Sequence, residues 1–131
     1  MAQTLVYLID DDEATLASTQ FLLGALGIAA VSFSDPFAFL QEVASLEPGC
    51  VLTDLRMPAM SGFELHAALR KKNIRWPVVL MSGHSALDSS SDALERGIFA
   101  TLEKPFTRQR LVKVLDRAFI ELRESAPSQS P

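Results

Sequence analysis

The sequence is poor in the residues that would build a disulfide framework, a nucleic-acid-binding surface or a membrane span. Cys50 is the single cysteine among 131 residues, which excludes an internal disulfide and suits a reducing compartment. The 12 Lys and Arg residues are outnumbered by 16 Asp and Glu, and a net charge of −4 argues against gripping nucleic-acid phosphates. The apolar runs are far shorter than the ~20 residues of a membrane helix, and nothing resembles a signal peptide. We therefore expect a cytoplasmic domain that itself binds neither nucleic acid nor membrane.

Short apolar segments alternate with longer amphipathic ones along the whole chain. The pattern predicts strands at 5–9, 28–33, 50–53, 77–81 and 98–102, and helices at 13–26, 35–46, 63–72, 87–96 and 107–123. Strict alternation implies a parallel sheet with helices on both faces, joined by right-handed crossovers. We expect one domain over residues 4–123, followed by a flexible tail or linker at 124–131, which is rich in Ser and Pro.

Three further side chains receive structural interpretations. In the first helix, an apolar stripe is predicted to include Phe21 together with Leu16, Leu22 and Leu26. His66 has no metal-binding companion at helical spacing, so we expect a surface residue and not a ligand. Cys50 opens a buried strand and is expected to be a small core residue.

Polar side chains stand where four of the predicted strands end. In an open parallel α/β sheet, ligands bind outside the carboxyl ends of the strands. The residues that follow the first, third, fourth and fifth strands are Asp10, Asp11 and Asp12, then Asp54, then Ser82, then Glu103 and Lys104. Several carboxylates, a hydroxyl and an ammonium are therefore predicted to converge on one edge of the sheet.

Such an arrangement points to phosphoryl chemistry. Clustered carboxylates repel one another and need a cation, and oxygen ligands without His or Cys favour Mg²⁺. Lys104 adds a fixed positive charge that would help to neutralise a transferred phosphoryl group. Asp54 stands alone at its strand end and is the best candidate for a nucleophilic oxygen, which would form an acyl phosphate. Singly, each residue has a structural explanation: Asp12 suits a helix cap, and Ser82 and Lys104 are ordinary loop residues.

Three segments carry a family resemblance. A resemblance to the receiver domain of two-component response regulators is carried by Val6–Glu13, Leu52–Gly62 and Glu103–Phe106. The sequence around Asp54 and Ser82 most resembles the FixJ-like branch of that family. The resemblance spans about Thr4 to Arg123. It implies a flavodoxin-like, doubly wound five-stranded parallel sheet of order 2-1-3-4-5 with five helices.

The resemblance also implies roles. Asp54 matches the phosphoacceptor, Asp10 and Asp11 match the acidic pair that holds Mg²⁺ together with Asp54, and the backbone carbonyl of Arg56 is a further ligand. Ser82 matches the switch hydroxyl, and Lys104 matches the lysine that pairs with the phosphate and precedes a cis proline. Such a domain catalyses its own phosphorylation and dephosphorylation as a signalling switch. The expected donor is a sensor histidine kinase.

The resemblance also implies an output. The expected surface for an output partner or homodimer is formed by the fourth helix, fifth strand and last helix. A DNA-binding output domain that regulates transcription is expected to follow residue 131, unless the chain ends there.

One position departs from the family pattern. Receivers usually carry Tyr or Phe three residues before the lysine, where this sequence has Thr101. A threonine cannot swing a ring into space vacated by Ser82, so a degenerate receiver that acts as a phosphorylation-independent interaction module stays open as an alternative. A small Mg²⁺-dependent phosphatase is a second alternative, although the chain is short for one. A flavodoxin-like cofactor protein is disfavoured because three aspartates would repel a phosphate after the first strand.

Overall fold

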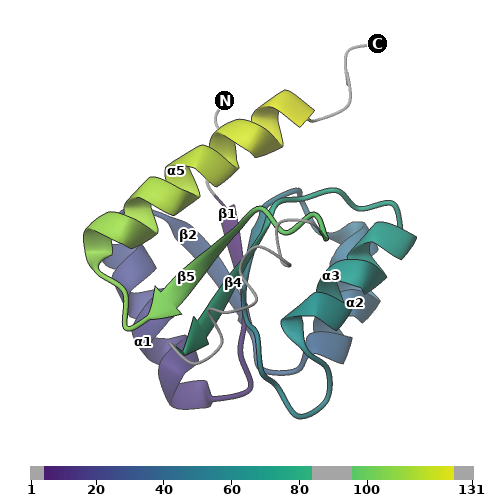
Figure 1. Cartoon of the computed structure of the whole chain (residues 1–131), viewed down its shortest axis with the longest axis horizontal. Helices are drawn as coiled ribbons and strands as arrows, with labels where there is room; N and C mark the ends of the chain where they lie inside the picture. Colours follow the sequence, from purple (N-terminus) through teal and green to yellow (C-terminus); the bar gives the residue numbers. More distant parts are fainter. Residues whose placement is uncertain (1–4, 84–95, 126–131) are drawn as a thin grey trace.

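The structure, a computed structural model, describes residues 5–83 and 96–125 (Figure 1). Strands and helices alternate in the order β1 (Leu5–Ile9), α1 (Glu13–Ala25), β2 (Ala29–Phe33), α2 (Pro36–Glu42), a 3-10 turn (Val43–Ser45), β3 (Cys50–Asp54), α3 (Gly62–Lys71), β4 (Val78–Gly83), β5 (Ala100–Lys104) and α5 (Arg108–Ser125). The helix predicted at 87–96 lies outside the described residues except for Arg96.

The five strands form one parallel sheet. Their order is β2-β1-β3-β4-β5, and every neighbouring pair is parallel. The predicted doubly wound fold is therefore confirmed. Figure 1 shows the arrowheads of β4 and β5 pointing to the same edge of the molecule. Because all strands are parallel, the carboxyl ends of β1 and β3 meet at that edge too.

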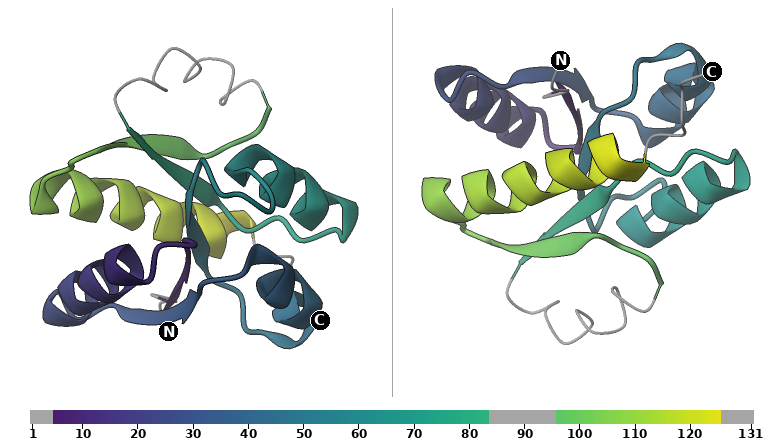
Figure 2. Two further views of the ribbon diagram at one scale, coloured as in Figure 1. Left: turned by 90° about the horizontal axis from the view of Figure 1, so that it is seen from below. Right: turned by 90° about the horizontal axis from the view of Figure 1, so that it is seen from above.

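Helices cover both faces of the sheet, with α1 and α5 on one side and α2 and α3 on the other (Figure 2). Successive strand residues point to opposite faces, so in β1 Val6 and Leu8 pack with the α1/α5 layer, whereas Tyr7 and Ile9 pack with the α2/α3 layer. Fully burying one such aliphatic side chain stabilises the fold by about 1.5–3 kcal/mol. The apolar strands are thus explained by burial on both sides.

The helix ends follow predictable chemistry. Asp12 and Asp35 are the N-caps of α1 and α2, and their side chains accept hydrogen bonds from the backbone two residues on. Gly27 takes a φ of +78° just after α1, a conformation that suits glycine at a helix end. Cys50 is buried as predicted, and burial raises its thiol pKa to about 12, which leaves it an inert core residue.

Three structural predictions were wrong. Phe21 is 80% exposed, because the inward stripe of α1 runs through Leu16, Thr19 and Leu23 and leaves Phe21 on the opposite side. His66 is only 5% exposed, because it lies on the stripe of α3 that also buries Leu65 and Leu69. The helix predicted at 35–46 is α2 followed by a separate 3-10 turn.

None of the helices in the described ranges combines the length and apolarity that crossing a bilayer requires.

Candidate functional site

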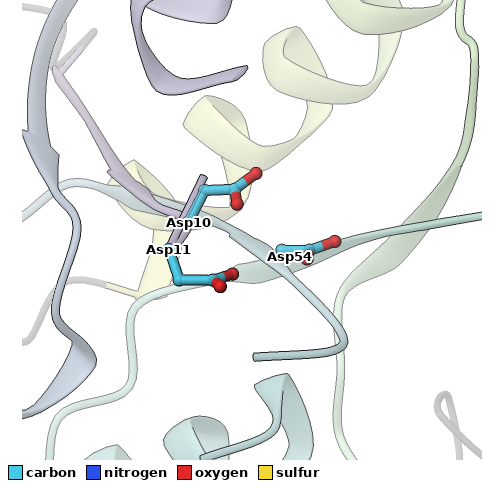
Figure 3. Close-up of side chains that lie close together, drawn as sticks. All are labelled: Asp10, Asp11 and Asp54. Atoms are coloured by element: carbon cyan, nitrogen blue, oxygen red, sulfur yellow. The ribbon is translucent and has the colours of Figure 1, made fainter. Parts of the chain in front are cut away.

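Three carboxylates gather at the carboxyl edge of the sheet. Asp10 and Asp11 follow β1, and Asp54 is the last residue of β3, the neighbouring strand. One carboxylate oxygen from each lies within 4.8 Å of the others. Figure 3 shows the three side chains extending in similar directions from adjacent strand ends. The convergence predicted from strand ends is therefore present for these three residues.

Asp10 is the buried member of this acidic cluster, at 2% exposed. Its Oδ1 accepts a hydrogen bond of 3.0 Å from the backbone N–H of Asp12. Its Oδ2 is buried and has no hydrogen-bond partner among the described residues. Burial is the main cause that raises the pKa of Asp10, and the nearby Asp54 and Asp11 carboxylates raise it further. The negative charge of Asp10 is therefore only partly compensated by the protein.

Lys104 supplies the positive charge that faces this cluster. Its Nζ lies 3.1 Å from Oδ1 of Asp54 and 4.0 Å from Oδ2 of Asp10. It is the last residue of β5, where pairing with Gly83 of β4 fixes its position. The Lys104–Pro105 peptide bond is cis, as predicted. One ammonium against three carboxylates still leaves an excess of negative charge.

This donor set fits a hard divalent cation. The available atoms are carboxylate oxygens, one of them buried and without a hydrogen-bond partner, and no His or Cys belongs to the cluster. The charge left over after Lys104 is the charge that such a cation would neutralise. The acidic cluster could therefore hold a divalent cation such as Mg²⁺.

The loop that joins β3 to α3 runs beside the acidic cluster. Its first residue, Leu55, donates its N–H to the carbonyl of Met81 on β4 at 2.8 Å and accepts one from Gly62 at 2.8 Å. Arg56 follows directly, with an exposed side chain. Leu55, which lies between Asp54 and Arg56, is thus anchored through both its N–H and its carbonyl.

Ser82 lies on the neighbouring strand at the same edge. It is buried and comes one residue after Met81, which pairs with Asp54. β4 and β5 each extend two residues beyond their predicted ends, because the ladder continues through Ser82 with Glu103 and Gly83 with Lys104. Ser82 and Lys104 are therefore strand residues and not loop residues.

Asp12 belongs to the helix and not to the cluster. Its side chain accepts hydrogen bonds from Ala14 N at 3.2 Å and Thr15 Oγ1 at 2.7 Å. The bond from Thr15 is the main cause that lowers the pKa of Asp12. The capping interpretation is thus right for Asp12.

Two further positions bear on the site. Thr101 is partly buried on β5 opposite Leu80 of β4. Sequence reasoning missed Thr53, a buried residue whose hydroxyl donates a 3.0 Å hydrogen bond to the backbone carbonyl of Asp54. The available signal was a hydroxyl at the end of an otherwise apolar strand, directly before the candidate nucleophile.

Fold and site together define a doubly wound α/β domain with an oxygen-rich cation pocket and one lysine at the carboxyl edge of its sheet. A comparison with protein families matches residues 6–116 to the response regulator receiver domain. The chain belongs to this family and is a receiver domain of two-component response regulators.

Individual relatives agree with this assignment. The transcriptional regulatory protein FixJ of Bradyrhizobium diazoefficiens is 34% identical over 125 residues, which cover 95% of this chain and 61% of FixJ. The response regulator protein TmoT of Ectopseudomonas mendocina is 30% identical, over 98% of this chain and 60% of TmoT. The crystal structure of FixJ-N superposes with a TM-score of 0.87 at 32% identity, covering 93% of this chain and 98% of that one. The chain thus spans about six tenths of the length of these two regulators.

Proposed function

We propose that Asp54 accepts a phosphoryl group and that this modification switches the domain between two signalling states. The observation that carries the proposal is the Lys104 ammonium, 3.1 Å from an oxygen of Asp54, beside a cluster of carboxylates whose oxygens lie within 4.8 Å of one another. An acyl phosphate on Asp54 would form between this ammonium and the acidic pair. The proposed nucleophile and a compensating positive charge therefore lie together at one edge of the sheet.

Asp10, Asp11, Asp54 and the backbone carbonyl of Arg56 are the proposed ligands of Mg²⁺. When bound, Mg²⁺ neutralises charge on the phosphoryl oxygens and on the carboxylates. The only partly compensated charge of buried Asp10 favours cation binding before any donor arrives. Lys104 then remains available for a phosphoryl oxygen.

The proposed transfer is a substitution at phosphorus. An oxygen of the Asp54 carboxylate attacks the phosphorus of a phosphohistidine, an O–P bond forms, and the P–N bond breaks with its electron pair returning to the imidazole. Lys104 pairs with one phosphoryl oxygen, and Ser82 donates its hydroxyl to another after transfer. Water later attacks the same phosphorus, the bond from phosphorus to the Asp54 oxygen breaks, and inorganic phosphate leaves as the Asp54 carboxylate is regenerated. The domain promotes both steps on itself, which makes it a switch and not a turnover enzyme.

A sensor histidine kinase is the proposed donor, and α1 offers a surface for it. After Glu13, the exposed residues of this helix are all uncharged, namely Ala14, Ala17, Ser18, Gln20, Phe21, Gly24 and Ala25. Phe21 is a large apolar side chain left in water beside small ones, an arrangement that suits packing against another helix. Because α1 begins beside Asp10 and Asp11, a helix docked there would lie close to the acceptor.

The whole protein is proposed to regulate transcription. FixJ is named as a transcriptional regulatory protein and is longer than this chain, so we propose a receiver domain at 4–123, whose last helix runs on to Ser125, then a linker and an output domain beyond it. The proposed output or homodimer surface is β5 and α5 together with the helix predicted at 87–96. A cytoplasmic location follows from the proposed kinase and output.

The rival with a specific observation in its favour is the phosphorylation-independent module. It rests on Thr101, which replaces the expected aromatic ring on β5. A phosphatase function has no such observation behind it. The two surviving proposals differ in whether Asp54 is modified.

The deciding experiment is labelling with acetyl phosphate and Mg²⁺, followed by intact mass. Wild type is expected to gain one phosphoryl mass, Asp54→Ala is not, and Asp35→Ala, which removes an aspartate that caps α2, is expected to label like wild type. An unlabelled wild type would contradict the proposal and favour the module. Mass is the suitable signal because the only tryptophan, Trp76, lies before β4 and so at the opposite edge of the sheet from Asp54.

A further inference from the structure

Thr53 is a polar residue in a place that otherwise holds apolar ones. The buried polar and charged residues of the described part are Asp10, Thr19, Thr53, His66 and Ser82. Asp10 and Ser82 belong to the site. Thr53 is 0% exposed and directly precedes the proposed phosphoacceptor. A hydroxyl buried this deeply must be hydrogen-bonded to be tolerated.

The hydroxyl of Thr53 is hydrogen-bonded to the backbone of the next residue, Asp54. Oγ1 donates to the carbonyl oxygen of Asp54 at 3.0 Å. That carbonyl belongs to the peptide that joins Asp54 to Leu55. The N–H of the same peptide is also bonded, because Leu55 N donates to the carbonyl of Met81 at 2.8 Å. Both polar groups of this one peptide are therefore held.

The Asp54 carbonyl also lies close to the first residue of α3. A Cβ added to Gly62 would lie 3.0 Å from the Asp54 carbonyl oxygen, so only a glycine allows α3 to begin this near. Gly62 N also donates to the carbonyl of Leu55 at 2.8 Å. The peptide after Asp54 is thus restricted by two neighbours, the Thr53 hydroxyl and the first residue of α3.

We infer that Thr53 is a positioning residue for the phosphoacceptor, because its hydroxyl fixes the peptide from which the Asp54 carboxylate and the Arg56 carbonyl both take their directions. The inference rests on the proposed function of Asp54. A peptide free to rotate would tilt the Asp54 side chain on one side and the loop toward Arg56 on the other. Fixing it preorganises an attacking oxygen and a cation ligand together.

The plainer explanation is that Thr53 is a strand residue that happens to satisfy its own hydroxyl. Threonine favours strands, and its methyl group packs like that of valine. That explanation predicts that Thr53→Val leaves the chemistry unchanged. The positioning role predicts a loss that follows the hydroxyl and not the packing.

The test compares three variants in the whole chain. Thr53→Val removes the hydroxyl and keeps the shape, whereas Thr53→Ser keeps the hydroxyl and removes the methyl. Thr19→Val, on α1, is the control for removal of another buried threonine hydroxyl. The readouts are the rate of acetyl phosphate labelling, the Mg²⁺ dissociation constant from amide NMR shifts, and urea unfolding.

We expect Thr53→Val to label about three- to tenfold more slowly and to bind Mg²⁺ about threefold more weakly, the range set by one hydrogen bond. Thr53→Ser should keep the wild-type rate and Mg²⁺ affinity although it unfolds at lower urea, and Thr19→Val should keep both. Equal rates and affinities for Thr53→Val and wild type would overturn the inference, as would a Thr53→Ser as slow as Thr53→Val. A wild type that is not labelled would overturn the proposed function instead, and the Mg²⁺ affinities would then decide the role of Thr53.

Discussion

The ammonium of Lys104 lies 3.1 Å from Oδ1 of Asp54 and bridges the last residues of β5 and β3, two strands separated by β4. The same nitrogen is 4.0 Å from the buried carboxylate of Asp10. With its single charge, Lys104 therefore neutralises part of the negative charge that a divalent cation would neutralise with two. Under the proposed function, the lysine and the cation would compete for the carboxylates before transfer and share the phosphoryl oxygens after it.

This competition predicts an opposite effect of Lys104→Met on two measurements. Removing the ammonium leaves the three carboxylates less compensated, so Mg²⁺ should bind about three- to tenfold more tightly, a range reduced from the Coulomb value for solvent screening. NMR titration would measure this affinity. Labelling of Asp54 should become slower, because the phosphoryl charge loses its partner. Weaker Mg²⁺ binding in Lys104→Met would show that the lysine organises the pocket instead of competing in it.

Asp10→Asn should stabilise the Mg²⁺-free protein. The substitution removes a buried charge that burial and two neighbouring carboxylates disfavour, and we expect a gain of about 1–2 kcal/mol in urea unfolding at neutral pH. Because burial raises the pKa of Asp10 in the folded state, the fold takes up this proton first as the pH falls. The advantage of Asp10→Asn should therefore shrink as the pH is lowered from about 7 toward about 4. An advantage that grows on acidification would contradict the burial argument.

His66 should make the wild type sensitive to mild acid. Burial is the main cause that lowers the pKa of His66, and the nearby Arg70 lowers it further. The unfolded chain is thus protonated at a pH where the folded one stays neutral, so stability falls as the pH drops below about 6.5 and levels off once the folded ring is protonated. His66→Leu should lose this part of the pH dependence in urea unfolding between about pH 7 and pH 5. Parallel curves for the two proteins would exclude His66 as its source.

Much of the architecture was accessible from the sequence because it depends on local signals. Alternating apolar strands and capped helices gave the element order, with Asp12, Asp35 and Pro36 marking helix starts. The edge that gathers Asp10, Asp11, Asp54 and Lys104 followed from the rule that parallel strands end together. The carboxyl ends of β4 and β5 were set too early, because polar residues there continue the backbone ladder.

The remaining errors concern helix orientation and tertiary contacts. Phe21 and His66 were misplaced because residue type was given more weight than angular position on the helix. Angular position puts Phe21 on the solvent side of α1 and His66 on the buried side of α3. The role of Thr53 was out of reach because a hydrogen bond to the next carbonyl depends on how β3, β4 and α3 meet. Phosphoryl chemistry at Asp54 was predicted from the carboxylates and the lysine at the strand ends, whereas the histidine kinase as donor was predicted from the resemblance; both stay predictions.

Phe21 gives a prediction that separates kinase docking from chemistry. Phe21→Ser should slow transfer from a phosphorylated sensor kinase of the same organism, the one with the fastest wild-type transfer, by about tenfold, because a large apolar contact is lost. Labelling by acetyl phosphate, which needs no docked helix, should be unchanged. Ile120→Ser is the matched control, since Ile120 is also apolar and exposed but lies far along α5. Equal loss in both variants would remove α1 as the docking surface.

Gly62 and Gly24 make a matched pair for backbone approach. A Cβ on Gly62 would lie 2.5 Å from Cδ2 of Leu80 and 3.0 Å from the carbonyl oxygen of Asp54, whereas one on Gly24 would meet nothing within 4 Å. Gly62→Ala should therefore destabilise the fold by about 1–3 kcal/mol, because a buried leucine and a backbone carbonyl must shift. Gly24→Ala, inside α1, should stabilise it by about 0.5–1 kcal/mol through better helix propensity.

Urea unfolding at neutral pH measures both changes, and the slope of the transition shows whether unfolding stays cooperative. Because the displaced carbonyl is the one that Thr53 holds, Gly62→Ala should also slow labelling of Asp54, and Gly24→Ala should not. A Gly62→Ala protein with wild-type stability and labelling rate would mean that the loop after Asp54 moves freely. The backbone at Asp54 would then not be confined as the hydrogen bonds and close contacts indicate.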